Sequence, residues 1–161
     1  MAIETTVRSA RFFRLLILCQ KQAERLRGTT ERLLGECNEI DGPWISDCLG
    51  DPNFDDRLES FGAKFSRLQD MICDKLIPAF LQATGEKTGT LLDNLNRLEK
   101  FELVDNVEDW IEARGLRNRL VHEYIEDPQL LADALTEARR FSAVLFSTLG
   151  KFVTATENLA R

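Results

Sequence analysis

The stretch DPNFDDRLESFGAKFSRLQDMICDKL, residues 51–76, decides the fold class of this chain. Its apolar residues recur at alternating steps of four and three, which is the spacing of a helix packed along its whole length. They are Phe54, Leu58, Phe61, Phe65, Leu68, Ile72 and Leu76. Asp51 is placed to cap the first N–H groups, and Pro52 takes the first helical position, where its missing N–H costs nothing. The pattern predicts a long core helix that Pro78 kinks or ends.

The same spacing occurs near both ends of the chain. The first stripe consists of Phe12, Leu16, Cys19, Ala23, Leu26, Thr30 and Leu33. The last stripe follows the start signal Asp127-Pro128 and consists of Leu131, Leu135, Ala138, Phe141, Leu145, Leu149 and Phe152. Each stripe predicts one long helix with a buried face.

The first helix carries more apolar residues than one core contact requires. Phe13, Leu15, Ile17 and Leu18 lie beside its stripe and widen the apolar face. A surplus apolar face indicates a second packing partner, such as another subunit.

Shorter elements complete the chain. Residues 38–51 contain Gly42-Pro43 and Gly50 and are interpreted as a connection. Thr90 is expected to cap a short helix over residues 91–101, and Asp105 or Asn106 is expected to cap another that runs to about Tyr124. No alternation typical of a strand is present, so we predict an all-α fold: a four-helix up-and-down bundle plus one short helix, forming a single domain over residues 1–161.

The composition excludes several classes of protein. Acidic residues outnumber basic ones by 27 to 21, which gives a net charge of −6, the reverse of a protein that coats nucleic acid. The longest apolar run, residues 15–19, is far short of the roughly 20 residues that cross a bilayer. The cysteines show no CxxC pairing; they are Cys19, Cys37, Cys48 and Cys73. We therefore expect a cytoplasmic protein with free thiols and no membrane contact.

The chain contains one histidine, His122, and one tyrosine, Tyr124, which stand two residues apart. Imidazole chemistry therefore depends on this single site, and a His-based zinc cluster within one chain is excluded. On a helix that advances about 100° per residue, Asn118 lies one turn before His122, and Arg117 shares a line with Tyr124 beside them. Four polar side chains thus cover one arc at a helix end.

This cluster suits phosphodiester chemistry. The dipole at a helix C-terminus favours the cationic form of His122, and the forked guanidinium of Arg117 matches phosphate oxygens. His122 would move a proton on or off an oxygen, while Arg117 would stabilise the charge that develops on the phosphate. A two-fold axis beside this helix would add a second Arg and His, so a homodimer is expected.

The segment RNRLVHEY, residues 117–124, fits the R-x4-6-H-x-Y signature of the HEPN superfamily, including the Asn that commonly follows the Arg. The preceding VEDWIEAR, residues 107–114, resembles the helix that leads into this motif in HepT-like proteins, also called nucleotidyltransferase substrate-binding proteins. The resemblance is strong over about residues 91–128. Helix order and lengths suit the family from residue 11 to about residue 152.

The resemblance implies a homodimeric toxin, encoded beside a small MNT-type nucleotidyltransferase that acts as its antitoxin. Many HepT-like proteins are metal-independent ribonucleases. The resemblance therefore implies that RNA is the substrate, that no cofactor or metal is needed, and that DNA is not a partner. By motif match, Arg117 would stabilise the pentavalent phosphorus, and Asn118 would position the phosphate. His122 would act as general base or acid on the ribose 2′-OH or the leaving oxygen. Tyr124 matches the residue to which the partner transfers AMP.

Two other functions stay open. The acidic charge and the same helical faces also fit a non-catalytic subunit that binds a nucleotidyltransferase. Alternatively, the chain is a plain structural bundle in which His122 ends a helix and Arg117 is a surface ion-pair partner. Glu108, Asp109 and Glu112 have the ligand type of a hard cation, but no other helix supplies converging ligands, so we expect no metal site.

Overall fold

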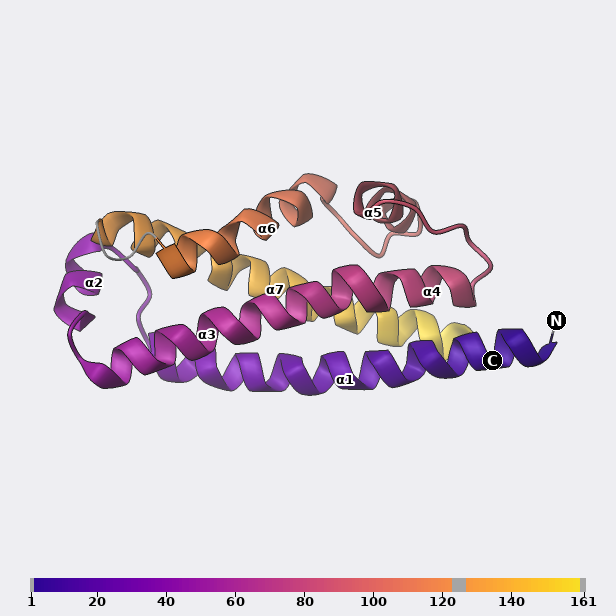
Figure 1. The fold of residues 1–161 in the computed structure, drawn as a ribbon, viewed down its shortest axis with the longest axis horizontal. Coiled ribbons are helices and arrows are strands. Elements are labelled where there is room, and N and C mark those ends of the chain that lie inside the picture. Colours follow the sequence, from indigo (N-terminus) through magenta and orange to yellow (C-terminus); the bar gives the residue numbers. More distant parts are fainter. Residues whose placement is uncertain (1, 123–126, 160–161) are drawn as a thin grey trace.

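The computed structural model describes residues 2–122 and 127–159, and the side chains of residues 7–120 and 127–157. All its regular elements are helices (Figure 1). They are α1 (Ala2–Leu34), α2 (Gly42–Cys48), α3 (Pro52–Met71), the π-helix η1 (Ile72–Leu76), α4 (Ile77–Ala83), α5 (Leu91–Lys100), α6 (Val107–His122) and α7 (Pro128–Leu159). The predicted all-α fold is confirmed, with one more short helix than expected.

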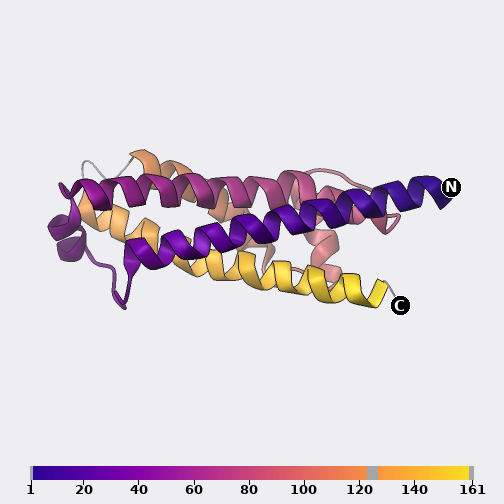
Figure 2. The same ribbon diagram turned by 90° about the horizontal axis from the view of Figure 1, so that it is seen from below.

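Four long rods run up and down to form the bundle. They are α1, the continuous rod α3–η1–α4, α6 and α7. Helix α1 packs against α3 and α7, and α6 packs against the same two neighbours, so α1 and α6 lie diagonally opposite (Figure 2). The short helix α2 covers one end of the bundle, while α5 lies across the other end, near both termini (Figure 1). The architecture is therefore a four-helix bundle with a short helix at each end.

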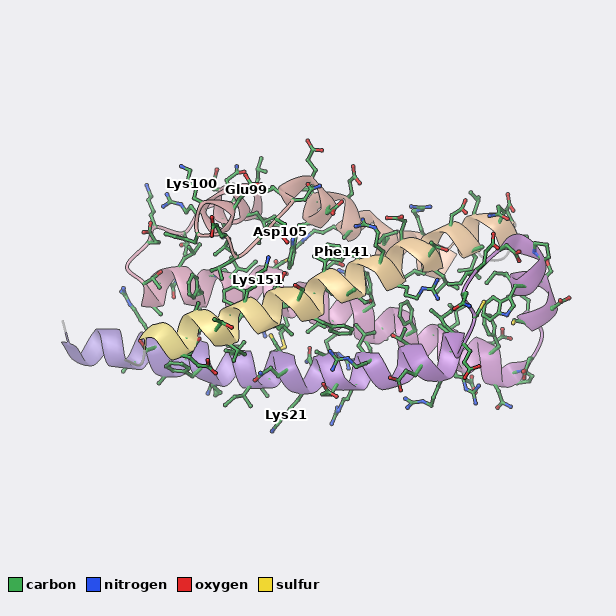
Figure 3. All side chains as sticks on the ribbon, turned by 180° about the vertical axis from the view of Figure 1, so that it is seen from behind. Lys21, Glu99, Lys100, Asp105, Phe141 and Lys151 are labelled. Atoms are coloured by element: carbon green, nitrogen blue, oxygen red, sulfur yellow. The ribbon has the colours of Figure 1, made fainter. Side chains whose placement is uncertain are left out.

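The predicted stripes form the core. Every residue of the three stripes is buried except Thr30, which is half-buried. Aromatic rings join the rods: the Trp110 ring of α6 lies edge-on to Phe141 of α7, with centroids 5.2 Å apart, and Phe141 also contacts Phe65 of α3. Lys151 of α7 donates to Asp105 at 2.8 Å, which ties the segment before α6 to α7 (Figure 3).

The predicted caps are present at the starts of four helices. Asp51 accepts from Asn53 N–H at 3.0 Å, and Asp127 accepts from Gln129 N–H at 2.9 Å. Thr90 and Asp93 form a reciprocal capping box at the start of α5. At the start of α6, where two candidates were open, Asn106 is the cap, because its Oδ1 accepts from Glu108 N–H at 3.1 Å. These side chains satisfy backbone N–H groups that have no partner inside their helices.

The interpretation of residues 38–51 as a connection is wrong, because α2 forms inside it. Asp41 accepts from Trp44 N–H at 2.9 Å and caps the helix. The Gly42 N–H donates to Gln129 Oε1 of α7, at a spot where an added Cβ would lie 2.9 Å from that oxygen. Ile45 is fully buried. Gly-Pro therefore starts a helix here, stabilised by a cap and by burial against α7.

Pro78 does not end the second rod, so of the two predicted effects, a kink or an end, the second is wrong. The helix continues through it to Ala83. The π-turn η1 precedes it, and Ile77 N–H donates to Ile72, five residues back. Because this turn has already shifted the hydrogen-bond ladder, the missing N–H of proline costs less than it would in a regular helix.

The surplus apolar face of α1 is only partly exposed. Leu15 belongs to the core, with 6% exposure, because it lies next to Leu16 on the inner face. Phe13, Ile17 and Leu18 are exposed, as predicted. Within the described ranges, no helix combines the length and apolar character needed to cross a membrane.

Candidate functional site

Three of the predicted site residues, Arg117, Asn118 and His122, lie on the second half of α6, whose described part reaches His122. Arg117 and Asn118 are exposed on this helix. The side chain of His122 lies outside the described residues, and so does the whole of Tyr124. The described part of the site is therefore the arginine end of the motif and its surroundings.

Arg117 forms an ion pair with Asp70 of α3. Its Nη1 donates to both carboxylate oxygens of Asp70, each at 3.1 Å. The pair faces solvent, since the two side chains are 45% and 38% exposed. A second pair lies about one turn away, where Arg114 of α6 donates at 2.6 Å to Asp74 of η1, the π-helix that continues α3.

These two pairs match because α3 and α6 run in opposite directions (Figure 1). Asp70 and Asp74 are four residues apart and so share one face of their helix. Arg114 and Arg117 are three residues apart and share a face of α6. Moving forward along α6 therefore means moving back along α3, and each arginine meets one carboxylate.

Buried Cys73 lies between the two carboxylates in sequence and close to the Arg114 guanidinium. Burial raises the pKa of this thiol to about 11, because the thiolate would lose its hydration, and the nearby Arg114 charge offsets only part of that effect. Cys73 is therefore a neutral core thiol, and the partner of Arg114 is the Asp74 carboxylate. All four cysteines are free.

An open groove of about 940 Å³ runs along the outer face of α3. Arg117 and Asn118 line one wall, Gln22 of α1 lines the other, and the floor includes Gly62 and Ser66. An added Cβ on Gly62 would meet nothing within 4 Å, so the floor is open there.

The groove is close to electrically neutral. Its charged lining consists of Arg67, Lys75 and Arg117 against Glu59, Asp70 and Asp74. Three charges of each sign produce no strong net field for a polyanion, so a phosphate would be held by local hydrogen bonds.

The structure thus places Arg117 and Asn118 together at one groove. The sequence did not identify Asp70 and Asp74 as site residues. The packing of the second rod against α6 places them beside Arg117 and Arg114. The only available signal was their Asp-x3-Asp spacing on the polar face of the second helix, and that spacing does not identify a partner helix.

Among the residues with described side chains, no three His, Cys, Asp or Glu groups are arranged to hold a metal ion. Asp109, one of the three acidic residues considered for a cation, pairs with Arg140 of α7. No protein-family model, no curated protein and no solved structure matches this chain.

Proposed function

We propose that this protein is a HepT-like endoribonuclease toxin that needs no metal, silenced by an MNT-type nucleotidyltransferase antitoxin. One observation carries the proposal. The R-x4-H-x-Y motif is intact in the sequence, and its Arg117 and Asn118 lie on α6 and line an open groove, while His122 is the last described residue of that helix.

The chemistry assigned to the motif requires no cofactor. The ribose 2′-OH attacks the adjacent phosphorus, its proton passes to a base, and the bond to the 5′ oxygen breaks as that oxygen takes up a proton. His122 serves these proton transfers, because imidazole titrates near neutral pH. Arg117 stabilises the extra charge on the phosphate oxygens in the transition state, and Asn118 positions the phosphate.

Tyr124 is the proposed point of control. Its phenol oxygen would attack the α-phosphorus of ATP in the partner enzyme, and pyrophosphate would leave. An AMP group two residues from His122 would repel an anionic substrate and fill the space that it needs. The modified toxin would therefore be inactive.

A homodimer in the cytoplasm is part of the proposal. Exposed Phe13, Ile17 and Leu18 on α1 support a second packing partner. Leu18 precedes Gln22 by one turn, so this apolar surface reaches the wall of the groove that faces Arg117. A two-fold axis near this groove would bring two motifs together. The site would then contain two arginines and two histidines in place of one of each.

The test is cleavage of a single-stranded RNA by the purified protein in excess EDTA. We expect the wild type to cleave, and His122→Ala and Arg117→Ala to lose at least about a hundredfold in rate. Arg140→Gln is the matched control, because Arg140 is also exposed and ion-paired but lies on α7, where it contacts Asp109 near the start of α6. Equal cleavage by all four proteins would refute the proposal.

A second function is favoured by the charge of the site. Arg117 is already paired with Asp70, and the groove is nearly neutral, as suits a subunit that binds a nucleotidyltransferase without cutting RNA. This function predicts a stable complex and addition of AMP to Tyr124 in the presence of ATP, with no RNA cleavage. Intact mass after co-expression with the neighbouring gene product, compared with Tyr124→Phe, measures it.

A further inference from the structure

We propose that Asp70 is a positioning residue for Arg117, which it holds by one guanidinium nitrogen so that the rest of the fork is presented to a phosphate in the groove. This inference rests on the proposed function of Arg117. It assigns a role to a residue of α3, 47 positions away in sequence, that the motif does not contain.

The geometry of the ion pair is the first support. Both oxygens of Asp70 accept from Nη1 alone. The Nε and Nη2 edge of Arg117 makes no hydrogen bond to any other described residue. That edge carries two parallel N–H groups, the arrangement that binds two phosphate oxygens at once. Asp70 therefore holds Arg117 without using the edge that recognises phosphate.

Arg117 is exposed, so its guanidinium needs an ion-pair partner to fix its orientation. A free arginine side chain carries about 2 kcal/mol of rotamer entropy. Arg117 is 45% exposed, and burial alone does not fix its position. The contact with Asp70 orders the guanidinium before substrate arrives, and such preorganisation lowers the cost of reaching the transition state.

The charge of Asp70 has a second, opposite effect. A carboxylate beside Arg117 weakens the attraction of the site for an anionic substrate in the ground state. Removing the carboxylate charge should therefore leave substrate binding unchanged or tighter, while the chemical step loses orientation. A residue that only ties two helices together would not separate the two kinetic parameters in this way.

The chain offers the controls that this test needs. Asp70→Asn should fold, because an exposed ion pair contributes little to stability and the buried rings of Phe65, Phe141 and Trp110 hold α3, α6 and α7 together. Asp109→Asn is the matched control, because it also removes one carboxylate from an exposed ion pair between α6 and a neighbouring helix. Both variants change the net charge by the same amount.

The experiment compares wild type, Asp70→Asn and Asp109→Asn for cleavage of an RNA oligonucleotide in EDTA. We expect Asp70→Asn to lower kcat at least about tenfold with KM unchanged or reduced, and Asp109→Asn to leave both within about twofold. An unchanged kcat in Asp70→Asn, or an equal loss in both variants, would overturn the role of Asp70.

A second measurement keeps this inference separate from the function it rests on. The Arg117 Nε–H signal in NMR spectra, identified with Arg117→Lys, should be sharp in wild type and shift on titration with inorganic phosphate. In Asp70→Asn it should broaden toward the signal of a free arginine. If the wild type cleaves no RNA but the signal behaves in this way, the ribonuclease proposal fails and the positioning role stands. If Asp70→Asn leaves the signal unchanged, the positioning role fails whatever the cleavage result.

Discussion

Arg117 of α6 and Asp70 of α3 meet through a single guanidinium nitrogen, with both carboxylate oxygens 3.1 Å from Nη1. The arginine that the motif assigns to phosphate binding is thus already part of an ion pair in this chain. Arg114 of α6 and Asp74 of η1 form a second ion pair about one turn away, through one nitrogen and one oxygen. The α3–α6 contact therefore combines two solvent-facing ion pairs with the apolar core beneath them.

The Arg117–Asp70 pair should contribute little to stability. Exposed ion pairs couple by about 0.2–1 kcal/mol, since water screens the charges and two side chains must be ordered. A double-mutant cycle with Arg117→Gln and Asp70→Asn in urea unfolding measures this coupling. Raising the salt from 0.1 M to about 1 M should reduce it further. A coupling of several kcal/mol would show that the pair is structural.

Trp110 should be among the most sensitive core positions. Its side chain is fully buried, with its ring edge-on to Phe141. Trp110→Ala should cost about 3–5 kcal/mol in the free energy of unfolding, because it removes a large apolar contact and leaves a cavity. Trp110→Phe should cost less, because an aromatic ring remains against Phe141. Urea unfolding followed by circular dichroism compares the two variants.

Ile45 tests whether α2 is part of the bundle. It is fully buried, although the sequence around it resembles a connection. Ile45→Ala should therefore cost about 2–4 kcal/mol. Ile111→Ala on α6 is the control, since Ile111 is 43% exposed and its replacement should change stability by less than about 0.5 kcal/mol. Similar small effects at both positions would mean that α2 does not hold its place in solution.

Two buried thiols predict a loss of stability in alkali. Burial raises the pKa of Cys19 to about 12 and that of Cys73 to about 11, above the ordinary value of 9.0. Above pH 9 the unfolded chain releases these protons while the folded chain keeps them, so the free energy of unfolding falls as pH rises. Cys19→Ala should show a smaller fall between pH 7.5 and 10 than the wild type. An identical fall would exclude Cys19 as a source.

The exposed apolar residues of α1 predict a change in association. Ile17 is 52% exposed, so Ile17→Glu should leave the thermal unfolding of the single chain almost unchanged. In the proposed dimer the same substitution buries a charge at the subunit contact and should shift the protein toward monomer. Sedimentation velocity at several concentrations measures the shift. Asn96→Glu, at an exposed position on α5, is the control, because it makes the same change in net charge away from this face of α1.

Periodicity alone predicted most of the fold. The stripes that begin at Phe12, Phe54 and Leu131 are buried as expected, and Asp51, Thr90 and Asp127 cap the helices that they were predicted to cap. These features are local: a stripe follows from the 3.6-residue turn, and a cap satisfies N–H groups two or three residues away.

The candidate site was only half predictable. The motif located Arg117 and Asn118 from residue types and spacing within one helix. It could not identify Asp70 and Asp74, because the match between them and the arginines depends on the register of two antiparallel helices. Two local predictions were wrong for a related reason: Pro78 does not end its helix, which a π-turn precedes, and residues 38–51 form α2, where Gly42 contacts Gln129.

The sequence by itself determined which faces are buried, where helices start, and that the chain's only histidine and tyrosine share a motif with Arg117. Only the tertiary structure decided what lies opposite each face: Asp70 on Arg117, Gln129 on Gly42, and a groove between α1 and α6. The physical reason is that hydrophobic periodicity records burial without direction, whereas ion pairs and grooves depend on which helices become neighbours.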